Sequence, residues 1–518
     1  MDRGPVAPGR RRRLRRTPTT LTLAVCVAAL ALLPLAYIAW YTVDIGWSGV
    51  RELVFRPRVG ELLWNTARLV AGTVLCCAVL GLGAAWLVER SSVPARRVWH
   101  VLLVAPLAVP AFVNSYAWIS VLPGLDTYAG ALLVVTLSYF PFVYLPLAAA
   151  FRGLDPALEE TARGLGLSSW AVFLRVQLPQ LRVALLGGSL LVALHLLAEF
   201  GALQMLRYPT FTTAIYDQYR ATFNGPGATM LAGVLVLLCL GLLLAEIRLR
   251  GQRGYARTGR GAARPVRPVA LHALTAPALL GLAVLVGLAL VVPLASLGYW
   301  MATGASTALD WESLTTTTGT TLALAAAAAA VTTAMALPTG WLAVRARGRI
   351  ATLLERSTYL GSAVPGIVVA LALVTLSVRV TPWLYQTVPV LLAAYAILFL
   401  PRAIVTVRSG VEQSTPLYDD VAASLGSSAL DRLRRITLPL LAPGIGAGAA
   451  LVFLAVVTEL TATLLLAPTG TTTLATAFWS ASSALEYGAA APYAVIMVLL
   501  SAPATVLLSH DARRGLTT

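Results

Sequence analysis

Two acidic side chains interrupt apolar stretches of this sequence. Glu199 and Glu459 are each preceded by a long run of mostly aliphatic residues. A carboxylate in such a run would lie within a membrane, where ionisable groups are costly and mark functional sites by default. His195 precedes Glu199 by one helical turn and can share its face. We therefore expect Glu199, Glu459 and His195 to line a gate, with a structural hydrogen bond between helices as the alternative.

Residue types that would support other chemistry are missing or scattered. All 39 residues counted as lysine or arginine are arginine, so the chain has no lysine for a phosphate-binding loop or for Schiff-base catalysis. The cysteines and histidines form no metal-ligand spacing. We expect no catalytic site, no metal and no cofactor, so the chain is not expected to be an enzyme. The residues concerned are Cys26, Cys76, Cys77, Cys239, His100, His195, His272 and His510.

The composition predicts a chain embedded in lipid. Of 518 residues, 58% are hydrophobic and only 12% are charged. Apolar runs of about 20 residues, the length that crosses a bilayer, recur throughout and predict an all-α membrane protein with about 12 spans. The predicted spans are 21–43, 62–88, 98–122, 128–150, 183–206, 228–248, 272–302, 317–344, 353–378, 383–406, 441–467 and 489–509.

The net charge of +17 is distributed unevenly along the chain. If the N-terminus is inside, 32 of the 39 arginines fall in cytoplasmic segments, among them the N-terminal tail, the stretch 248–267 and the segment 402–435. The positive-inside rule requires such an asymmetry. We expect a multi-pass protein of the inner (cytoplasmic) membrane, with both termini in the cytoplasm. Its basic segments would contact anionic lipid rather than nucleic acid.

The second half of the sequence repeats the first. An offset of 255 residues relates Thr66, Trp86, Arg90 and Pro110 to Thr321, Trp341, Arg345 and Pro365, and an offset of 260 relates Pro141 and Glu199 to Pro401 and Glu459. Six spans in each unit would give both units the same orientation, so the repeats are parallel with a path between them. The predicted parts are a basic cytoplasmic tail (1–19), a first six-helix unit (20–250), an Arg- and Gly-rich cytoplasmic linker (251–270) and a second six-helix unit (271–518).

One loop in each unit, 153–182 in the first and 409–441 in the second, follows a common pattern. The sequences read LEETARGLGLSSWAVFLRVQLPQLR from residue 158 and YDDVAASLGSSALDRLRRITLPLLA from residue 418. Leu158, Ala162 and Leu165 follow the i, i+4, i+7 rule, as do their counterparts in the second loop, and predict a short amphipathic helix. Gly166 and Gly426 predict a left-handed cap, and a proline then marks the start of the next span. Such a helix is suited to dock into a groove on another protein.

The two loops resemble the EAA loop of binding-protein-dependent ABC importer permeases. The residues that match the family pattern, and that the resemblance therefore assigns to ATPase coupling, are Glu160, Ala162, Gly166, Leu178, Pro179, Asp420, Ala422, Gly426, Leu438 and Pro439. Thr161 and Val421 replace the first alanine of the pattern, and Asp420 replaces its glutamate. Because the likeness covers nearly the whole chain, it implies the type I permease fold in a single chain with two units. This arrangement is typical of the iron(III) and thiamine importers.

The resemblance also implies partners. Two ATP-binding cassette subunits would dock on the two loops from the cytoplasm, and an extracytoplasmic binding protein would deliver the substrate. The Thr-rich segments 207–219 and 468–479, in which Thr212 and Thr213 align with Thr472 and Thr473, resemble iron(III) permeases. The expected function is therefore an ATP-driven importer permease for iron(III). The alternatives are an ABC permease for thiamine or another small solute, and a proton-coupled secondary transporter of 6+6 type.

Overall fold

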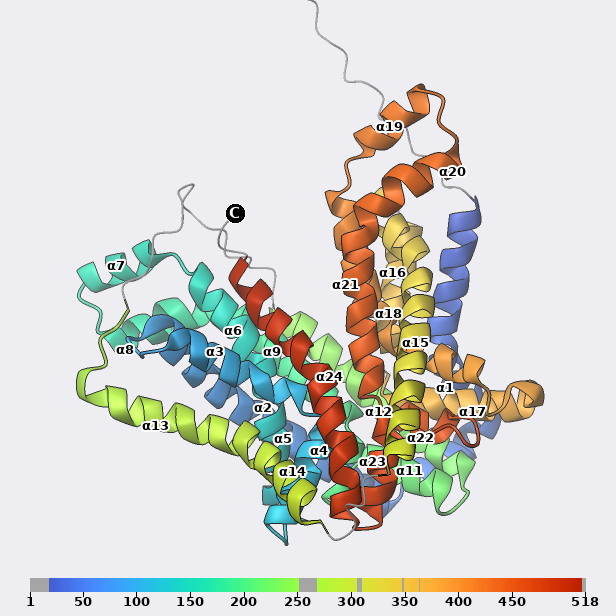
Figure 1. Ribbon diagram of the computed structural model, residues 1–518, viewed down its shortest axis with the longest axis horizontal. Helices are drawn as coiled ribbons and strands as arrows, with labels where there is room; N and C mark the ends of the chain where they lie inside the picture. Colours follow the sequence, from blue (N-terminus) through green and yellow to red (C-terminus); the bar gives the residue numbers. More distant parts are fainter. Residues whose placement is uncertain (1–17, 251–267, 305–309, 347–348, 363, 515–518) are drawn as a thin grey trace, which may run out of the picture. The chain divides into compact units, whose positions relative to one another are not determined.

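A computed structural model describes residues 18–250, 268–304, 310–346, 349–362 and 364–514 (Figure 1). Within these ranges the secondary structure is helical, apart from one isolated bridge between Ser91 and Val269. Most of the predicted tail 1–19 and linker 251–270 therefore lies outside the described residues. An all-helical architecture is what lipid requires of long apolar segments, because every backbone N–H and C=O group must be satisfied within the segment.

The helices follow one another with short connections. Those of the first half are α1 (Pro18–Val54), α2 (Pro57–Arg90), α3 (Arg96–Val104), α4 (Ala111–Val121), α5 (Tyr128–Tyr139), α6 (Pro141–Gly153), α7 (Pro156–Gly164), α8 (Ser169–Val172), α9 (Leu178–Ala198), α10 (Gly201–Met205), α11 (Phe211–Arg220) and α12 (Gly225–Arg250). Those of the second half are α13 (Thr275–Val286), α14 (Val292–Thr303), α15 (Trp311–Arg345), α16 (Arg349–Ser362), α17 (Gly366–Val380), α18 (Val388–Gln413), α19 (Pro416–Ser424), α20 (Ala429–Arg432), α21 (Leu438–Val457), α22 (Thr461–Leu466), α23 (Leu474–Ser483) and α24 (Tyr487–Arg514).

The apolar helices make this a multi-pass membrane protein. The described residues contain 8 helices long and apolar enough to cross a membrane, or up to 11 if each bent pair is one span, and a shorter apolar helix at Tyr487–Pro503. The count of about 12 straight spans expected from the sequence is therefore too simple. The predicted span 98–122 is bent by 93° between Ala108 and Ala111. Pro110 forms the N-cap of α4 and Pro365 that of α17, because proline cannot continue a preceding helix.

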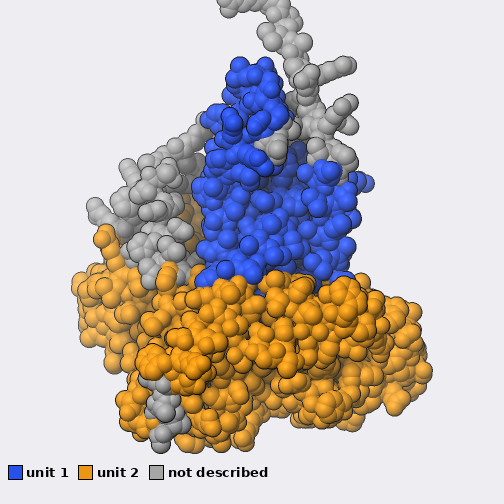
Figure 2. Space-filling view, turned by 45° about the vertical axis from the view of Figure 1, so that its right-hand side comes forward, with its two compact units in different colours: residues 1–33, 326–362, 395–453 blue, residues 34–325, 363–394, 454–518 orange. Residues whose placement is uncertain are grey.

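The described chain divides into two compact units that do not coincide with the two sequence repeats (Figure 2). One unit comprises residues 1–33, 326–362 and 395–453, and the other comprises 34–325, 363–394 and 454–518. In the predicted division by repeats, residues 20–250 and 271–518 form separate units. Here each compact unit takes segments from both halves of the chain, so we describe each by itself.

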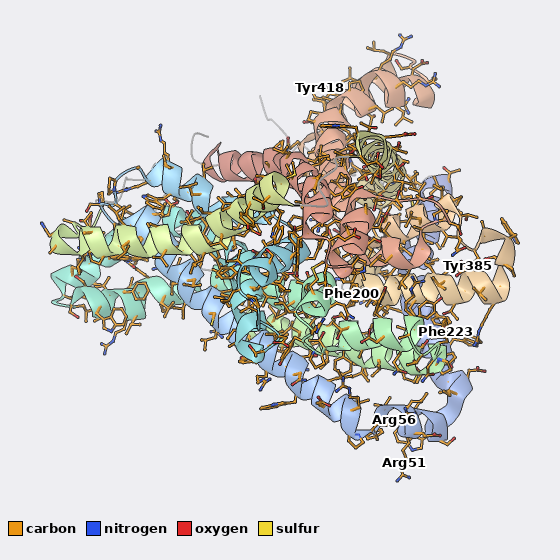
Figure 3. The ribbon with its side chains drawn as sticks, turned by 60° about the horizontal axis from the view of Figure 1, so that its bottom comes forward. Arg51, Arg56, Phe200, Phe223, Tyr385 and Tyr418 are labelled. Atoms are coloured by element: carbon orange, nitrogen blue, oxygen red, sulfur yellow. The ribbon has the colours of Figure 1, made fainter. Side chains whose placement is uncertain are left out.

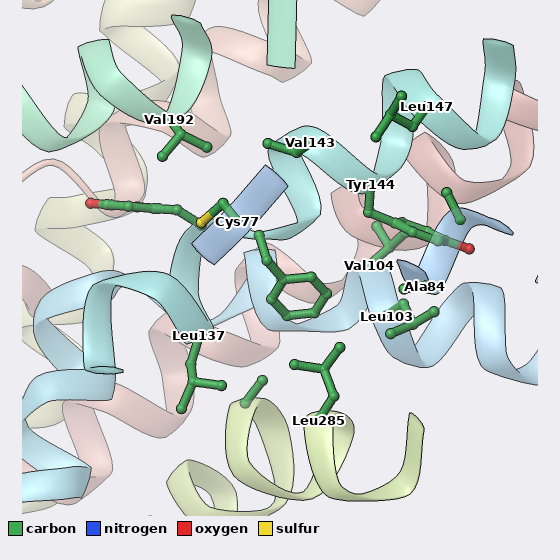
Figure 4. Packing of buried hydrophobic residues seen from close by; sticks show 14 of the residues in the cluster. Cys77, Ala84, Leu103, Val104, Leu137, Val143, Tyr144, Leu147, Val192 and Leu285 are labelled. Atoms are coloured by element: carbon green, nitrogen blue, oxygen red, sulfur yellow. The ribbon is translucent and has the colours of Figure 1, made fainter. Parts of the chain in front are cut away.

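The core of the larger unit forms where α2, α6 and α9 pack together. Its buried side chains include Cys77, Leu103, Tyr144 and Val192 (Figure 4). A Cβ atom at Gly188 would lie 2.8 Å from the Cα atom of Val143, so only glycine allows α9 to approach α6 this closely. Small residues that bring backbones together are typical of membrane helix packing.

The smaller unit has the equivalent close approach between α18 and α21. A Cβ atom at Gly444 would lie 2.8 Å from the carbonyl oxygen of Thr406, and one at Gly448 would lie 2.5 Å from the Thr406 Oγ1 atom. Gly448 is 260 residues after Gly188. In each unit, therefore, the helix that leads into the Leu-Gly/Leu-Pro loop is held tightly against the helix that leaves it.

Helix α18 differs from its predicted span in one consequential way. The expected span ended at 406, and the segment from 402 onward was assigned to the cytoplasmic side. The helix instead continues without a break to Gln413, with Pro401 inside it. Arg402 therefore lies near the middle of a spanning helix, contrary to the prediction.

Candidate functional site

The first loop carries the short helix α7, with a capping motif at each end. Asp155 accepts a hydrogen bond from the N–H of Ala157 at the N-terminus (3.1 Å). At the C-terminus the N–H of Leu167 donates to the carbonyl of Ala162 (3.1 Å) and that of Gly166 to the carbonyl of Arg163 (2.9 Å). These two bonds form a Schellman motif, which requires a left-handed residue. Gly166 has φ +85°, so the predicted left-handed cap is confirmed.

The second loop repeats this backbone in α19, near the outer end of the smaller unit (Figure 1). The N–H of Ser427 donates to the carbonyl of Ala422 (3.0 Å), and that of Gly426 to the carbonyl of Ala423 (3.1 Å). Gly426 has φ +82°. A Cβ atom at Gly166 or Gly426 would meet no atom of the chain within 4 Å, so backbone conformation rather than crowding calls for glycine.

The exposed faces of these helices differ from the i, i+4, i+7 face expected from the sequence. Ala162 and Ala422 are buried (6% and 7% exposed), whereas Leu165 and Leu425 are each 79% exposed. The small residues therefore seat the helices on their own chain, and a different apolar surface faces outward. This surface comprises Leu158, Leu165 and Trp170 in the first loop and Leu417, Tyr418, Val421 and Leu425 in the second, with Tyr418 visible in Figure 3.

A buried ion pair anchors α7 to the end of α2. The Arg90 guanidinium pairs with the Glu159 carboxylate, and both side chains are less than a tenth exposed. Arg152, at the end of α6, lies 3.5 Å from Glu89. Glu160, which matches the family pattern, is exposed instead. The sequence showed Arg90 as repeat-equivalent to Arg345, but the pairing with Glu159 could not be read from it.

Arg345 holds the second loop. Its Nη2 atom donates to the carbonyl oxygen of Ser414 (2.5 Å) and to the Ser414 Oγ atom (3.2 Å), just before the N-cap of α19. The two repeat-equivalent arginines thus attach the two loops at different points. The side chains of Asp419 and Asp420 lie outside the described part of this loop.

The Leu-Pro pairs do not mark the start of the next helix, as the sequence suggested. Helical backbone begins about ten residues earlier and passes through a π-helical turn at Phe173–Gln177 and at Leu433–Thr437. Pro179 and Pro439 follow these turns. A proline removes one backbone donor and clashes with the preceding turn, and a π-turn is one way for a helix to absorb it.

Glu199 lies at a break in the backbone between α9 and α10. Its Oε1 atom accepts a hydrogen bond from the N–H of Ala202 (2.8 Å), and its Oε2 atom accepts one from the Tyr139 hydroxyl (2.5 Å). The Glu199 carbonyl accepts one from the Thr212 hydroxyl (2.6 Å). A carboxylate at a helix N-terminus satisfies donors that the helix itself leaves free.

Glu459 lies at the equivalent break between α21 and α22. It accepts hydrogen bonds from the N–H of Ala462 (2.9 Å), the N–H of Thr463 (3.1 Å) and the Thr463 hydroxyl (2.8 Å). Both carboxylates therefore bind their own backbone and a hydroxyl. This arrangement matches the structural alternative, although it bonds within a broken span more than between spans. The gate role of both acids stays a prediction.

The two breaks are neighbours within the larger unit. A Cβ atom at Gly201 would lie 2.9 Å from the Leu460 Cδ2 atom, so the backbone after Glu199 packs directly on the residue after Glu459. Phe200, labelled in Figure 3, lies 5.4 Å from Trp479 between ring centroids. His195 is placed one turn before Glu199, as expected, and contacts the rings of Phe142 (4.3 Å) and Tyr139 (6.1 Å).

The Thr-rich segments form matched helix caps in a different register from the one predicted. Thr210 and Thr213 form a capping box at α11, and Thr473 and Thr476 form one at α23. Thr210 therefore corresponds to Thr473, and the predicted alignment of Thr213 with Thr473 is wrong by three residues. A short insertion between Glu459 and Thr473 explains the shift, because the sequence offset changes after the breaks.

No other chemical site is evident in the described part of the chain. Those residues contain no group of three or more His, Cys, Asp or Glu side chains placed to hold a metal ion. The four cysteines are free.

Comparison with known proteins agrees with this architecture. The family described as "Binding-protein-dependent transport system inner membrane component" matches residues 78–248 and 336–514. A Fe(3+)-transport system permease protein of Haemophilus influenzae is 38% identical over 96% of this chain and 99% of its own length. A sulfate transport permease of Escherichia coli is 27% identical over 46% of this chain and 93% of its own length. A molybdate/tungstate permease of Thermococcus kodakarensis is 24% identical over 36% and 77%, respectively.

The family model covers well over half of the chain, in two copies that fall in the two halves. The first match includes α7 with Gly166, and the second includes α19 with Gly426. The chain therefore belongs to the inner-membrane permeases of binding-protein-dependent transport systems, with the family domain repeated twice.

Proposed function

We propose that this chain is the permease of an ATP-driven importer for iron(III), energised by two separate ATP-binding cassette subunits. The observation that carries the proposal is the duplicated coupling helix: α7 and α19 share one backbone motif, one exposed apolar surface and one position in the repeat. A surface loop without a partner has no reason to conserve all three within one chain.

Each helix presents apolar side chains suited to a groove on an ATPase. Leu165 and Leu425 project from the two helices at the residue before the left-handed glycine. Large exposed apolar side chains mark surfaces that bind other proteins. We infer one ATPase subunit for each helix, because each loop offers a single helix of this kind.

The architecture supports rigid-body transmission from these helices. The close packing of α6 on α9 at Gly188, and of α18 on α21 at Gly448, makes each loop the tip of a stiff helical pair. Closure of the ATPases would move the tips, and the packed pairs would carry that motion into the spans. Glu199 and Glu459 would sit at the gate that this motion opens.

The direction and the cargo rest on the sequence. The arginine-rich segments place both termini and both coupling loops in the cytoplasm, so a binding protein would meet the opposite face. Iron(III) is favoured because the relative that matches nearly the full length of both chains is a Fe(3+) permease. The sulfate and molybdate/tungstate permeases match a single half and at lower identity.

The test is uptake by reconstituted vesicles that contain this chain, its ATPase and its binding protein from neighbouring genes. We expect uptake of radiolabelled iron(III) only when ATP can be hydrolysed, with no competition from excess thiamine, sulfate or molybdate. A matched control replaces ATP with a non-hydrolysable analogue. Uptake by the chain alone, driven by a pH step, would instead establish the proton-coupled alternative.

A further inference from the structure

An arginine lies in the middle of one membrane-spanning helix. Arg402 is roughly 21 Å from the first residue of α18 and roughly 17 Å from the last, at 1.5 Å per residue, in a bilayer whose apolar core is about 30 Å thick. A charged side chain at such a depth faces the interior of the bundle or a water-filled cavity rather than lipid. Its position therefore predicts an aqueous surface along α18.

The Arg402 side chain is available to a ligand. It is exposed on its unit, and its guanidinium carbon lies 5.2 Å from the centre of the Phe399 ring. In the ranges described above, no carboxylate forms an ion pair with it. By contrast, Arg408 on the same helix pairs with both Glu412 and Glu355.

Polar residues extend from Arg402 along one face of α18. Thr406, Ser409 and Gln413 follow it at i+4, i+7 and i+11, and the Gln413 side chain donates to the Ser409 hydroxyl (3.3 Å). The stripe thus runs from the middle of the helix to the end that carries the coupling loop.

The first repeat has no such stripe. The positions of α6 that correspond to it at an offset of 260 are Phe142, Pro146, Ala149 and Gly153. Helix packing, which α6 and α18 share at Gly188 and Gly448, therefore does not require the polar residues. A feature present on one helix only is better explained by what that helix binds.

The acidic residues of the spans are not free to ligate a bare cation. Glu199 and Glu459 are committed to the backbone and hydroxyl donors of their own breaks. Elsewhere in the described chain no His, Cys, Asp and Glu cluster could hold iron(III). The unpaired charge within the spans is thus positive at Arg402, which repels a trivalent cation and attracts an anion.

We propose that Arg402 lines the translocation path and binds the cargo through an anionic oxygen ligand. Iron(III) then crosses as a complex of net negative charge, with carboxylate or phosphate groups directed outward. The planar guanidinium pairs with either group through two parallel hydrogen bonds, and Ser409 and Gln413 offer further donors on the way out. The inference rests on the proposed function and adds the chemical class of the transported species.

The first experiment follows the anion. Vesicles that contain the complete transporter receive radiolabelled iron(III) in separate arms with labelled citrate, labelled phosphate or labelled bicarbonate. We expect one of these anions to enter with iron in a fixed ratio and to depend on ATP. Entry of iron without any of them overturns the inference, while the wild-type requirement for ATP still stands as the test of the proposed function.

The second experiment changes Arg402 and measures iron uptake together with ATPase retention. Because the charge-assisted pair is lost, we expect Arg402→Gln to lower uptake about tenfold or more, and Arg402→Lys to retain an intermediate rate. Arg356→Gln, which removes an exposed arginine of α16, is the matched control. Unchanged or faster uptake in Arg402→Gln overturns the proposal, since a barrier to cations would give that result. If the variant fails to assemble, co-entry of the labelled anion in the wild type decides.

Discussion

The two coupling loops share their backbone but differ in the side chains that attach them. Both have a helix of the same length, a Schellman motif and a glycine at φ +85° or +82°. The first loop is held by a buried ion pair between Arg90 and Glu159, whereas the second is held through Arg345 and Ser414. The same contrast holds deeper in the spans, where the carboxylate caps at Glu199 and Glu459 are duplicated and Arg402 has no counterpart.

This contrast indicates which features the duplicated unit must keep. Caps, breaks and π-turns fix the path of the backbone, and a change in either copy would displace a helix. Side-chain attachments can differ as long as the helix stays in place. Variants of backbone features should therefore act alike in the two halves, and variants of side-chain attachments should act on one half only.

The largest effect is expected at the buried ion pair. Arg90→Leu leaves the Glu159 carboxylate buried without its partner, which costs about 3–5 kcal/mol. Hydrogen exchange of residues 156–164 should therefore become at least a hundredfold faster, while exchange of residues 416–424 stays unchanged. The double variant Arg90→Leu/Glu159→Leu should recover most of the protection. Equal acceleration in both loops, or in neither, would contradict a local anchor.

A smaller and symmetrical effect is expected at the two glycines. A β-branched residue at positive φ is strained by about 1–3 kcal/mol, equivalent to roughly 5- to 150-fold in ATPase affinity. Gly166→Val and Gly426→Val should each weaken ATPase binding by a similar factor, measured with tagged permease and titrated ATPase.

The first loop offers a matched control for the glycine test. Gly164 lies two residues before Gly166, within α7, and a Cβ atom there would also meet open space. Gly164→Val should bind ATPase nearly as well as the wild type. Asn tolerates the left-handed conformation, so Gly166→Asn should restore part of the affinity. Equal losses in Gly164→Val and Gly166→Val would show that side-chain bulk, rather than φ, limits binding.

Much of this arrangement could be predicted from the sequence, because it depends on local chemistry. Glycine after a short amphipathic helix predicts a left-handed cap, and Gly166 and Gly426 adopt it. The apolar runs predict spanning helices, although not the 93° bend before α4. The family pattern locates both loops, since Gly and Leu-Pro recur at fixed spacing.

The rest depends on contacts between distant residues. Glu159 and Arg90 are far apart in the sequence, and nothing in either segment indicates that they meet. Arg402 was assigned to a loop because a basic residue near a span end follows the positive-inside rule, and only the continuous α18 places it at mid-span. The carboxylate caps were missed for a similar reason, because an apolar run does not reveal where its helix breaks.

The smallest effect is expected at the two carboxylates. In Glu199→Gln and Glu459→Gln the amide keeps one acceptor and loses the charge, which should weaken each cap by about 1–2 kcal/mol. If these residues form the gate, both variants should assemble with ATPase and import iron more slowly, by similar factors. Normal uptake in both would leave only the structural hydrogen bonds, and loss of assembled protein would favour structure over gating.

The most direct test of the coupling assignment is a cross-link from the two exposed leucines. A photoreactive residue is introduced at Leu165 or Leu425, each 79% exposed, and at Leu237 on the apolar surface of α12 (69% exposed) as the control. The account predicts a cross-link to the ATPase from both leucines of the loops and none from Leu237. Assembled transporter that yields no ATPase cross-link from either loop would show that α7 and α19 are not the coupling helices.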